Sequence, residues 1–385
     1  MAQPIGVGVR RRPADQGDRP VTPVPISSGR PASAHSRQRK WPAKEDRNRL
    51  AEPISVLVSE RHFLDHLAPI WHALPENRRG VFLVTRPELI PWVEGRGITG
   101  AEVLNFGLHK ARAPGPFLTA SSGDLRRIID RWGPLTPQIY LNHGAGFSWL
   151  GLNHTSYAGG GHWLDRVGLF LDPNEYAARR NRKSHPKAMV RAIGCPKLDH
   201  WHNQDAKPAD PAGPLVCISF HWHCTVVNET DWAWPFFQNA IPELPAHYRM
   251  IGHGHPRAIS FLAKRYERAG FDTLMDFEDV LARADVYVND SSSTLYEFAS
   301  LDRPVVVMNS PKYRRRVNHG LRFWEHEDVG VICNKQEELV DAVARAIEDA
   351  PKQQALRHAA TQDVYPIRGN AAQAAVEAIE EFCDG

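Results

Sequence analysis

The sequence has few cysteines and no long apolar segment, and each absence restricts the class of protein. Its 385 residues include five cysteines, none in a C-x-x-C pair, so we expect a reducing compartment and no disulfide framework. No apolar run approaches the roughly 18 residues that a membrane-spanning helix needs. The charged N-terminus is not followed by the apolar segment of a secretory signal. These absences predict a cytoplasmic protein and leave peripheral membrane attachment open.

Motifs that would indicate several common chemistries are also missing. The chain has no G-x-G-x-x-G with dinucleotide spacing, no P-loop lysine and no G-x-S-x-G elbow. This disfavours NAD, ATP-driven phosphoryl transfer and a serine hydrolase. His221, His223 and Cys224 are ligand types, but their spacing matches no common zinc arrangement. We therefore predict no metal and no required cofactor.

Positive charge is concentrated at the N-terminus. Residues 1–50 hold eleven Lys or Arg against four acids, a net +7, and the remaining 36 basic and 40 acidic residues give the rest −4. The segment also has seven prolines and almost no large apolar residues, so it cannot bury enough surface to fold. We predict a disordered basic tail. A solvating extension is favoured over contact with nucleic acid or an anionic membrane.

Short apolar runs alternate with helical periodicity over residues 54–194. ISVLVS, GVFLVT, AEVLNFG, QIYLNHG and RVGLFLD predict strands, and FLDHLAPIWHAL, PELIPWVEG and PNEYAARRN predict helices between them. Alternation of this kind is typical of a parallel sheet with helices on both faces.

A polar stretch rich in Pro, Ala and Asp, residues 202–214, then predicts a linker. Beyond it LVCISF, YRMIGHG, DVYVND and PVVVMN predict strands. DWAWPFFQNAI and PRAISFLAKRYERAG predict helices, the second beginning at Pro256. The expected organisation is a tail (1–50), a first α/β domain (51–201), the linker, a second α/β domain (215–350) and a helical C-terminal segment (351–385).

The ends of four predicted strands are markedly polar. They are NHGAG at 142–146, FHWHC at 220–224, GHGHP at 252–256 and NDSSS at 289–293. Ligands of open α/β sheets bind beyond the carboxyl ends of the strands, and two such domains are expected to place the site in the cleft between them. These four ends therefore supply the expected site residues.

The three serines at 291–293 allow two interpretations. A turn that starts a helix presents unpaired backbone N–H groups and the positive end of the helix dipole, which suit a phosphate. A serine can also simply cap the helix and stabilise it by about 1 kcal/mol. Glu297 lies one helical turn after Ser293, where its carboxylate could accept hydrogen bonds from ligand hydroxyls or remain a solvated charge.

Residues 279–309, DVLARADVYVNDSSSTLYEFASLDRPVVVMN, resemble the late motif of the CDP-glycerol glycerophosphotransferase family. The matching positions are Asp290, Ser292, Ser293, Glu297, Phe298, Arg303 and Pro304. NHGAG, IGCPKLD and GHGHP resemble other motifs of the family in the same order, so the resemblance covers about residues 137–310. Two departures are Lys197 in place of the usual arginine and HWHCTVVNE in place of a Pro-Thr-aromatic-Arg segment.

The resemblance implies a GT-B fold with two Rossmann-like domains facing a central cleft, the acceptor in the first and the donor nucleotide in the second. It implies that His143 deprotonates the acceptor hydroxyl and that His255 binds or protonates the donor diphosphate. Histidine suits both roles because it exchanges protons near pH 7. The remaining expected site residues are Ser291, Ser292, Ser293, Thr294, Glu297, His253, His221 and His223 on the donor side, and Gly144, Lys197 and Asp290 elsewhere in the cleft.

Three functions from different classes follow. The first is a GT-B transferase that moves a glycosyl or polyol-phosphate group from a nucleoside-diphosphate donor to a hydroxyl of a glycan, polyol-phosphate polymer or lipid-linked acceptor. The second is a nucleotide-sugar epimerase of the same architecture. The third is a non-catalytic nucleotide-binding or scaffold protein that works through its basic tail. We favour the transferase, because the strand ends show few of the acids that such an epimerase needs.

Overall fold

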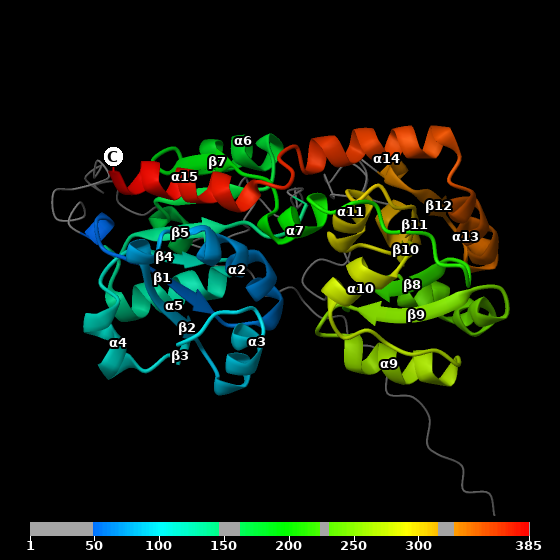
Figure 1. Ribbon diagram of the computed structural model, residues 1–385, viewed down its shortest axis with the longest axis horizontal. Coiled ribbons are helices and arrows are strands. Elements are labelled where there is room, and N and C mark those ends of the chain that lie inside the picture. The colour runs from blue at the N-terminus through cyan, green and yellow to red at the C-terminus, as the bar shows by residue number, and fades with distance from the viewer. Residues whose placement is uncertain (1–48, 146–161, 224–230, 315–326, 385) are drawn as a thin grey trace, which may run out of the picture. The chain divides into compact units, whose positions relative to one another are not determined.

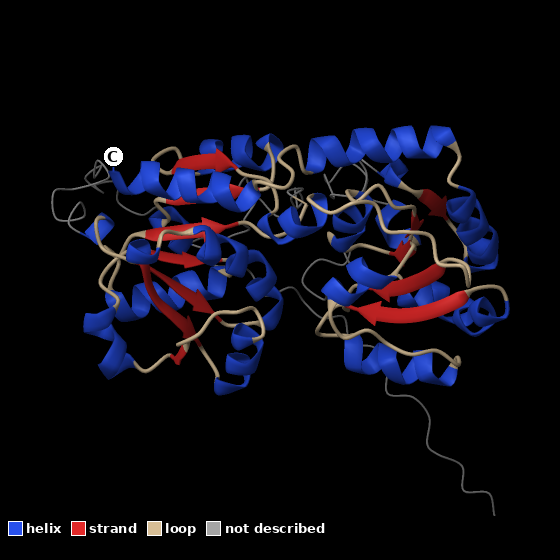
Figure 2. Cartoon of the chain, viewed as in Figure 1, coloured by secondary structure: helices blue, strands red, loops and turns tan. Residues whose placement is uncertain are grey.

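The computed structural model describes residues 49–145, 162–223, 231–314 and 327–384. Residues from Lys40 onward cluster as one compact unit. The expected basic tail lies outside the described residues except for its last two positions. Figure 1 shows the order of the elements along the chain, and Figure 2 separates helices from strands.

The first half of the described chain forms a seven-stranded parallel sheet of order β3-β2-β1-β4-β5-β6-β7. Its strands are β1 (Ile54–Val58), β2 (Arg79–Val84), β3 (Glu102–Val103), β4 (Phe117–Thr119), β5 (Gln138–Leu141), β6 (Leu169–Asp172) and β7 (Met189–Ala192). Its α-helices are α2 (Leu64–Ala73), α3 (Ile90–Glu94), α4 (Phe106–Arg112), α5 (Ser122–Trp132), α6 (Glu175–Ser184) and α7 (Asp199–His202). Short 3-10 helices are η1 (Arg61–Phe63), η2 (Glu76–Arg78), η3 (Pro87–Leu89), η5 (His162–Arg166) and η6 (Pro196–Leu198).

The second half forms a five-stranded parallel sheet of order β12-β11-β10-β8-β9. Its strands are β8 (Leu215–Phe220), β9 (Arg249–Gly254), β10 (Val286–Asn289), β11 (Val305–Met308) and β12 (Val331–Cys333). Its α-helices are α8 (Trp234–Phe237), α9 (Ile259–Arg268), α10 (Phe277–Arg283), α11 (Thr294–Ala299), α12 (Pro311–Arg314) and α13 (Leu339–Glu348). Its 3-10 helices are η8 (Gln238–Ala246), η10 (Glu327–Val329) and η11 (Gln336–Glu338).

Burial explains why these strands are apolar along their whole length. All five residues of β1 and all four of β10 and β11 are buried. A parallel sheet covered by helices on both faces needs apolar side chains on both sides of each strand. The predicted pair of parallel α/β sheets is therefore confirmed.

Two helices at the C-terminus run back across the chain. Helix α14 (Pro351–Val364) packs against α11 and η10 of the second half, whereas α15 (Ala371–Asp384) packs against α2 and β6 of the first. Figure 1 shows α14 over the second sheet and α15 over the first. Five residues of α15 join the core of the first sheet: Ala375, Val376, Ala378, Ile379 and Phe382. The last helix thus belongs to the core formed by the first residues of the fold.

Several predicted elements differ from the structure. Strands β4 and β12 were not predicted, because runs of three residues are too short to show a pattern. The helix predicted for DWAWPFFQNAI is α-helical for only four residues and continues as the 3-10 helix η8. Pro242 and Pro245 lie inside η8, and each proline removes a donor of an α-helical hydrogen bond. Helix α9 begins at Ile259 and not at Pro256.

Loss of the contact between α15 and the first sheet should destabilise the fold. Ile379 is fully buried, so Ile379→Ala removes apolar contacts and leaves a cavity, and we expect a loss of about 2–5 kcal/mol in the free energy of unfolding. Glu377→Ala, on the exposed side of the same helix, should change it by less than about 0.5 kcal/mol. Urea titration followed by circular dichroism measures both; equal midpoints would show that α15 is not part of the core.

Candidate functional site

The turn after β5 holds His143 in a fixed backbone conformation. Asn142 donates from Nδ2 to Asp172, a fully buried carboxylate whose pKa burial raises to about 7. On the other side of the turn, Asn174 Nδ2 donates to the Ala145 carbonyl at 2.9 Å. Gly144 between them has φ 102°, which other residues rarely adopt. The glycine of the predicted motif is therefore required by the backbone.

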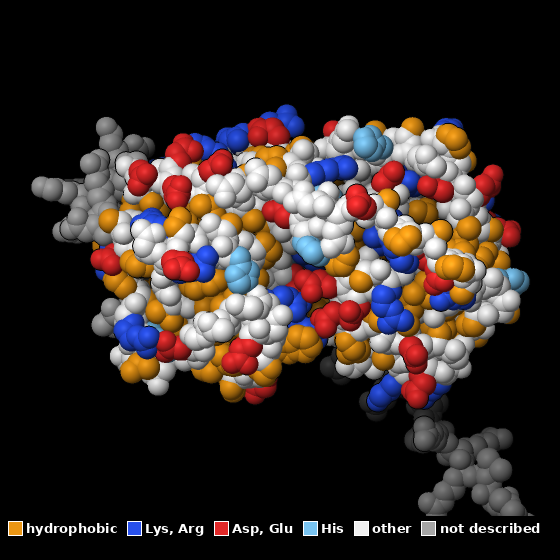
Figure 3. All heavy atoms as spheres, viewed as in Figure 1, with side chains coloured by type: hydrophobic (Ala, Val, Ile, Leu, Met, Phe, Trp, Pro, Cys, Tyr) orange, Lys and Arg blue, Asp and Glu red, His pale blue; other side chains and the backbone are white. Residues whose placement is uncertain are grey.

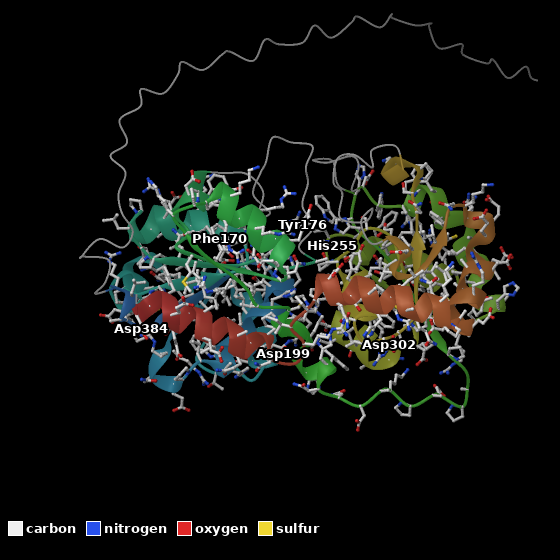
Figure 4. All side chains as sticks on the ribbon, turned by 90° about the horizontal axis from the view of Figure 1, so that it is seen from above. Phe170, Tyr176, Asp199, His255, Asp302 and Asp384 are labelled. Atoms are coloured by element: carbon white, nitrogen blue, oxygen red, sulfur yellow. The ribbon has the colours of Figure 1, made fainter. Side chains whose placement is uncertain are left out.

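Three imidazoles lie in a row where the two halves meet. The His62 ring centroid is 6.1 Å from that of His143 and 6.0 Å from that of His255. His62 comes from η1 after β1 and His143 from the end of β5, both in the first half, while His255 follows β9 in the second. Figure 4 labels His255 on the side of the second sheet that faces the first. The structure therefore brings together the two histidines predicted to be catalytic, with a third between them.

His255 is arranged as a neutral hydrogen-bond donor. The backbone N–H of Arg257 donates to its Nδ1 at 3.2 Å, so Nδ1 carries no proton and Nε2–H can donate to a ligand oxygen. Burial, and then the nearby His221 and His62, lower the pKa of His255 to about 2. In the free protein His255 is thus an uncharged donor, and the predicted alternative of protonating the donor diphosphate needs a bound anion to raise this pKa.

The neighbouring histidines are also held neutral. Burial, followed by the charges of Lys197 and Arg257, lowers the pKa of His62 to about 4. His253 donates from Nδ1 to the Leu274 carbonyl at 2.9 Å, and burial lowers its pKa to about 4 as well. A neutral imidazole can accept a proton from an attacking hydroxyl. The cluster is suited to general-base chemistry and to hydrogen bonding of phosphate oxygens.

Asp290 positions two loops at the end of β10. Its buried carboxylate accepts hydrogen bonds at 2.8 Å from the backbone N–H groups of His221 and Ala233. Burial raises its pKa to about 6, although those hydrogen bonds lower it. The side chain therefore connects the ends of β8 and β10 and holds His221, which is itself buried and 5.0 Å from His255 between ring centroids.

In the serine turn, residues 291–293, different residues cap helix α11 and reach the surface. Ser292 Oγ accepts from the backbone N–H of Thr294 at 3.3 Å, whereas Ser293, at the N-cap of α11, makes no side-chain capping bond. Thr294 shares a hydrogen bond of 2.9 Å with the Tyr287 hydroxyl. Ser291 is fully buried, while the other three are partly exposed. Capping thus explains Ser292 in part and does not explain Ser293.

Glu297 is not a solvated charge. It is 2% exposed, and its carboxylate accepts from Lys197 Nζ at 2.7 Å, so that a side chain of the second half pairs with one of the first. Lys197 also lies over the Phe277 ring at 4.5 Å. Burial disfavours the ammonium, but Glu297 and Asp65 outweigh it and raise the pKa of Lys197. Lys197, which was expected in the cleft, therefore forms an ion pair that joins the two halves.

A pocket of about 340 Å³ opens beside this ion pair. Its walls include Asp65, Arg96, Lys197, Trp201 and Glu278 from both halves. The row of three imidazoles and the serine turn do not line this pocket. Figure 3 shows acidic and basic side chains gathered where the two halves meet. Arg96 pairs with Asp65 at 2.7 Å and with Glu278 at 3.4 Å. The charged side chains of this pocket thus pair largely with one another.

Sequence reasoning missed several polar residues at the same strand ends. His62 stands in SERHFLDH directly after β1, which is a polar strand end without glycine or repeated serine. Asp231 and Lys312 lie 81 residues apart and are joined by a hydrogen bond of 2.5 Å. The rule that ligands gather at strand ends could have found His62; no local pattern could have paired Asp231 with Lys312.

Within the described residues, no group of three or more His, Cys, Asp or Glu is placed to hold a metal ion. Cys224, considered with His221 and His223, lies outside those residues. A search of the same described part of the chain finds no helix long and apolar enough to cross a membrane.

Two parallel α/β sheets whose polar strand ends meet define a GT-B-like fold. Residues 240–381 match the family model described as CDP-Glycerol:Poly(glycerophosphate) glycerophosphotransferase. This match covers 142 of the 385 residues and confirms the resemblance seen in the motifs and the prediction of a transferase. No curated protein sequence matches it.

Solved structures with the same fold include a teichoic acid polymerase and an epimerase. The Wall Teichoic Acid Polymerase TagF matches with a TM-score of 0.62 and 13% identity over 88% of this chain and 90% of that one. S. aureus MnaA, solved with UDP, has a TM-score of 0.60 and 14% identity over 86% and 97% of the two chains. UDP-GlcNAc 2-epimerase from Neisseria meningitidis has 0.56 and 13% over 86% and 100%. At these identities the likeness shows the fold.

The ion pair between Lys197 and Glu297 predicts a steep cost for removing one partner. Glu297→Gln leaves the buried ammonium unpaired, so we expect a loss of about 3–5 kcal/mol in the free energy of unfolding, and the double variant Lys197→Met/Glu297→Leu should recover most of it. Arg182→Met breaks an exposed pair with Glu175 and should cost at most about 1 kcal/mol. Guanidinium unfolding measures all three; equal losses in single and double variants would refute the pairing.

The lowered histidine pKa values predict that acid destabilises the fold. The pKa of His253 is near 6.5 in the unfolded chain and about 4 in the folded one, so unfolding takes up a proton between these pH values. The stabilising contribution of neutral His253 is therefore fully present above pH 6.5 and is lost as the pH falls through this range. For His253 alone we expect a loss of about 2 kcal/mol between pH 7.5 and pH 5. His253→Asn cannot titrate and should reduce the difference by that amount in urea unfolding at the two pH values; an unchanged difference would contradict a buried neutral His253.

Proposed function

We propose that this transferase moves glycerophosphate from CDP-glycerol to a hydroxyl of a poly(glycerophosphate)-like acceptor. The family description supports this donor and acceptor, and one TagF structure was obtained after a soak with CDPG. The observation that carries the proposal is the row of His143, His62 and His255, which spans both halves.

In this proposal the two sheets correspond to two domains with different ligands. The first, about residues 51–201, holds the acceptor; the second, about 215–350, holds the donor; residues 202–214 connect them, and the helices of 351–385 return to the first. The serine turn, His221 and His253 all lie at strand ends of the second sheet. Ser292 and Ser293, with partly exposed hydroxyls, donate to donor phosphates; Ser291 is too buried to do so.

His143 acts as the general base. It accepts the proton of the acceptor hydroxyl as the oxygen attacks the phosphorus that carries glycerol, and the bond from that phosphorus to the oxygen of CMP breaks. His255 donates from Nε2–H to a phosphate oxygen, which stabilises charge on the leaving group without an initial imidazolium. Phosphoryl transfer depends mostly on such positioning and electrostatic stabilisation. Glu297, held by Lys197, keeps the donor half in register with His143.

Replacement of His143 tests the proposal. His143→Asn should lower the rate of CMP release with acceptor by roughly 100- to 10,000-fold, since proton transfer by a positioned base contributes that much. The affinity for CDP-glycerol should stay within about threefold, because the residue touches the acceptor and not the donor. His358→Asn, on the exposed side of α14, is the control and should keep full activity.

A result for the epimerase alternative would be distinct. If the wild-type chain converts UDP-GlcNAc to an isomer without any acceptor, and CDP-glycerol neither binds nor reacts, the proposed donor and reaction are wrong. If no nucleotide of either kind raises the melting temperature, a scaffold role is favoured instead.

A further inference from the structure

Asp231 is a buried carboxylate that joins two groups able to carry positive charge. It is 2% exposed and accepts hydrogen bonds from His223 Nδ1 at 2.8 Å and from Lys312 Nζ at 2.5 Å. The backbone N–H of Trp232 also donates to it at 2.9 Å. Partners on both oxygens, Lys312 first and then His223, outweigh burial and lower the pKa of Asp231. The carboxylate is therefore charged and fully engaged.

The three residues follow the two strands that flank β10, with His223 and Asp231 after β8 and Lys312 after β11. His223 lies three residues after β8, Lys312 lies in α12 four residues after β11, and β10 is between these strands in the sheet. Asp290 at the end of β10 binds the backbone of Ala233, two residues from Asp231. The cluster thus shares the carboxyl edge with the serine turn, where ligands of open sheets bind.

The two partners of Asp231 reach the surface, although the carboxylate itself is buried. The side chains of His223 and Lys312 are 62% and 39% exposed, against 2% for Asp231. With Nδ1 of His223 donating to Asp231, its Nε2 is the nitrogen left for a ligand, and it can donate to a phosphate oxygen when the imidazole carries a proton on both nitrogens. One carboxylate facing two such groups leaves one positive charge when the imidazole is protonated. An anion beside them would complete the charge balance.

We propose that His223 and Lys312 together bind the phosphate of the leaving nucleotide, and that Asp231 is the positioning residue that holds both. This inference rests on the proposed function, because it takes the nucleoside-diphosphate donor from there. His223 stands in HWHCTVVNE, the segment in which the sequence departs from the family pattern, whereas Lys312 lies in α12. Together they offer two point donors at this edge of the sheet.

The two arms of the test separate phosphate from base recognition. Ligand-observed NMR with CMP and with cytidine measures the affinity of the full chain for each. His223→Gln and Lys312→Met should each weaken CMP binding roughly ten- to hundredfold, as expected for lost hydrogen bonds to a charged group, and should leave cytidine binding within about twofold. Lys264→Met, an exposed lysine of α9, is the matched control and should change neither.

Asp231→Asn tests the positioning role. We expect the affinity for CMP to fall about as far as in His223→Gln. The double variant Asp231→Asn/His223→Gln should lose little more affinity for CMP than either single variant. Histidine ¹⁵N NMR of the CMP complex, assigned with His223→Gln, should show both ring nitrogens of His223 protonated in the wild type and not in Asp231→Asn. A carboxylate with only a structural role would leave the two spectra alike.

The outcomes distinguish this inference from the proposed function. If His223→Gln and Lys312→Met bind CMP as wild type does while His143→Asn still abolishes transfer, the phosphate-binding pair is wrong and the transferase stands. If cytidine binding falls as much as CMP binding, the pair contacts the base and the inference is again wrong. If the wild type binds neither CMP nor CDP-glycerol, the proposed function itself fails, and the inference with it.

Discussion

The hydrogen-bonded ion pair between Lys197 and Glu297 is the interaction on which the arrangement of the site depends. It joins η6 of the first half to α11 of the second, with both side chains almost completely buried. Because the serine turn leads directly into α11, fixing Glu297 also fixes the turn relative to the first half. The ammonium of Lys197 also lies over the face of Phe277.

The charge of Lys197 also influences the histidines around it. It contributes, after burial, to the lowered pKa values of His62, His66 and His253. A positive charge that is neutralised on one side by Glu297 still disfavours imidazolium on the other. The same pair that holds the halves together therefore adds to the effect of burial in keeping His62, His66 and His253 deprotonated. Binding of an anionic donor would act in the opposite direction and favour protonation.

Much of the architecture could be predicted from the sequence, because a parallel sheet buried on both faces produces apolar runs that are easy to recognise. The polar ends of those runs led to His143, His255 and the serine turn. What could not be predicted depends on contacts between distant segments. Glu297 in isolation is a helix acid, and only the fold places Lys197 beside it. The return of α15 to the first core left no pattern in the sequence, since an amphipathic helix packs equally well on either sheet. His62 lies between the predicted strand ISVLVS and the predicted helix FLDHLAPIWHAL, and its position at a strand end was overlooked.

Transfer of glycerophosphate from CDP-glycerol to a hydroxyl acceptor, with release of CMP, is tested most directly by ³¹P NMR of the wild-type chain with CDP-glycerol and a short glycerophosphate oligomer. We expect the diphosphate signals to disappear while a phosphodiester signal and CMP increase in equal amounts, and we expect neither product to form without the oligomer. Release of free glycerol phosphate at the same rate with and without the oligomer, or no loss of the diphosphate signals, would contradict it.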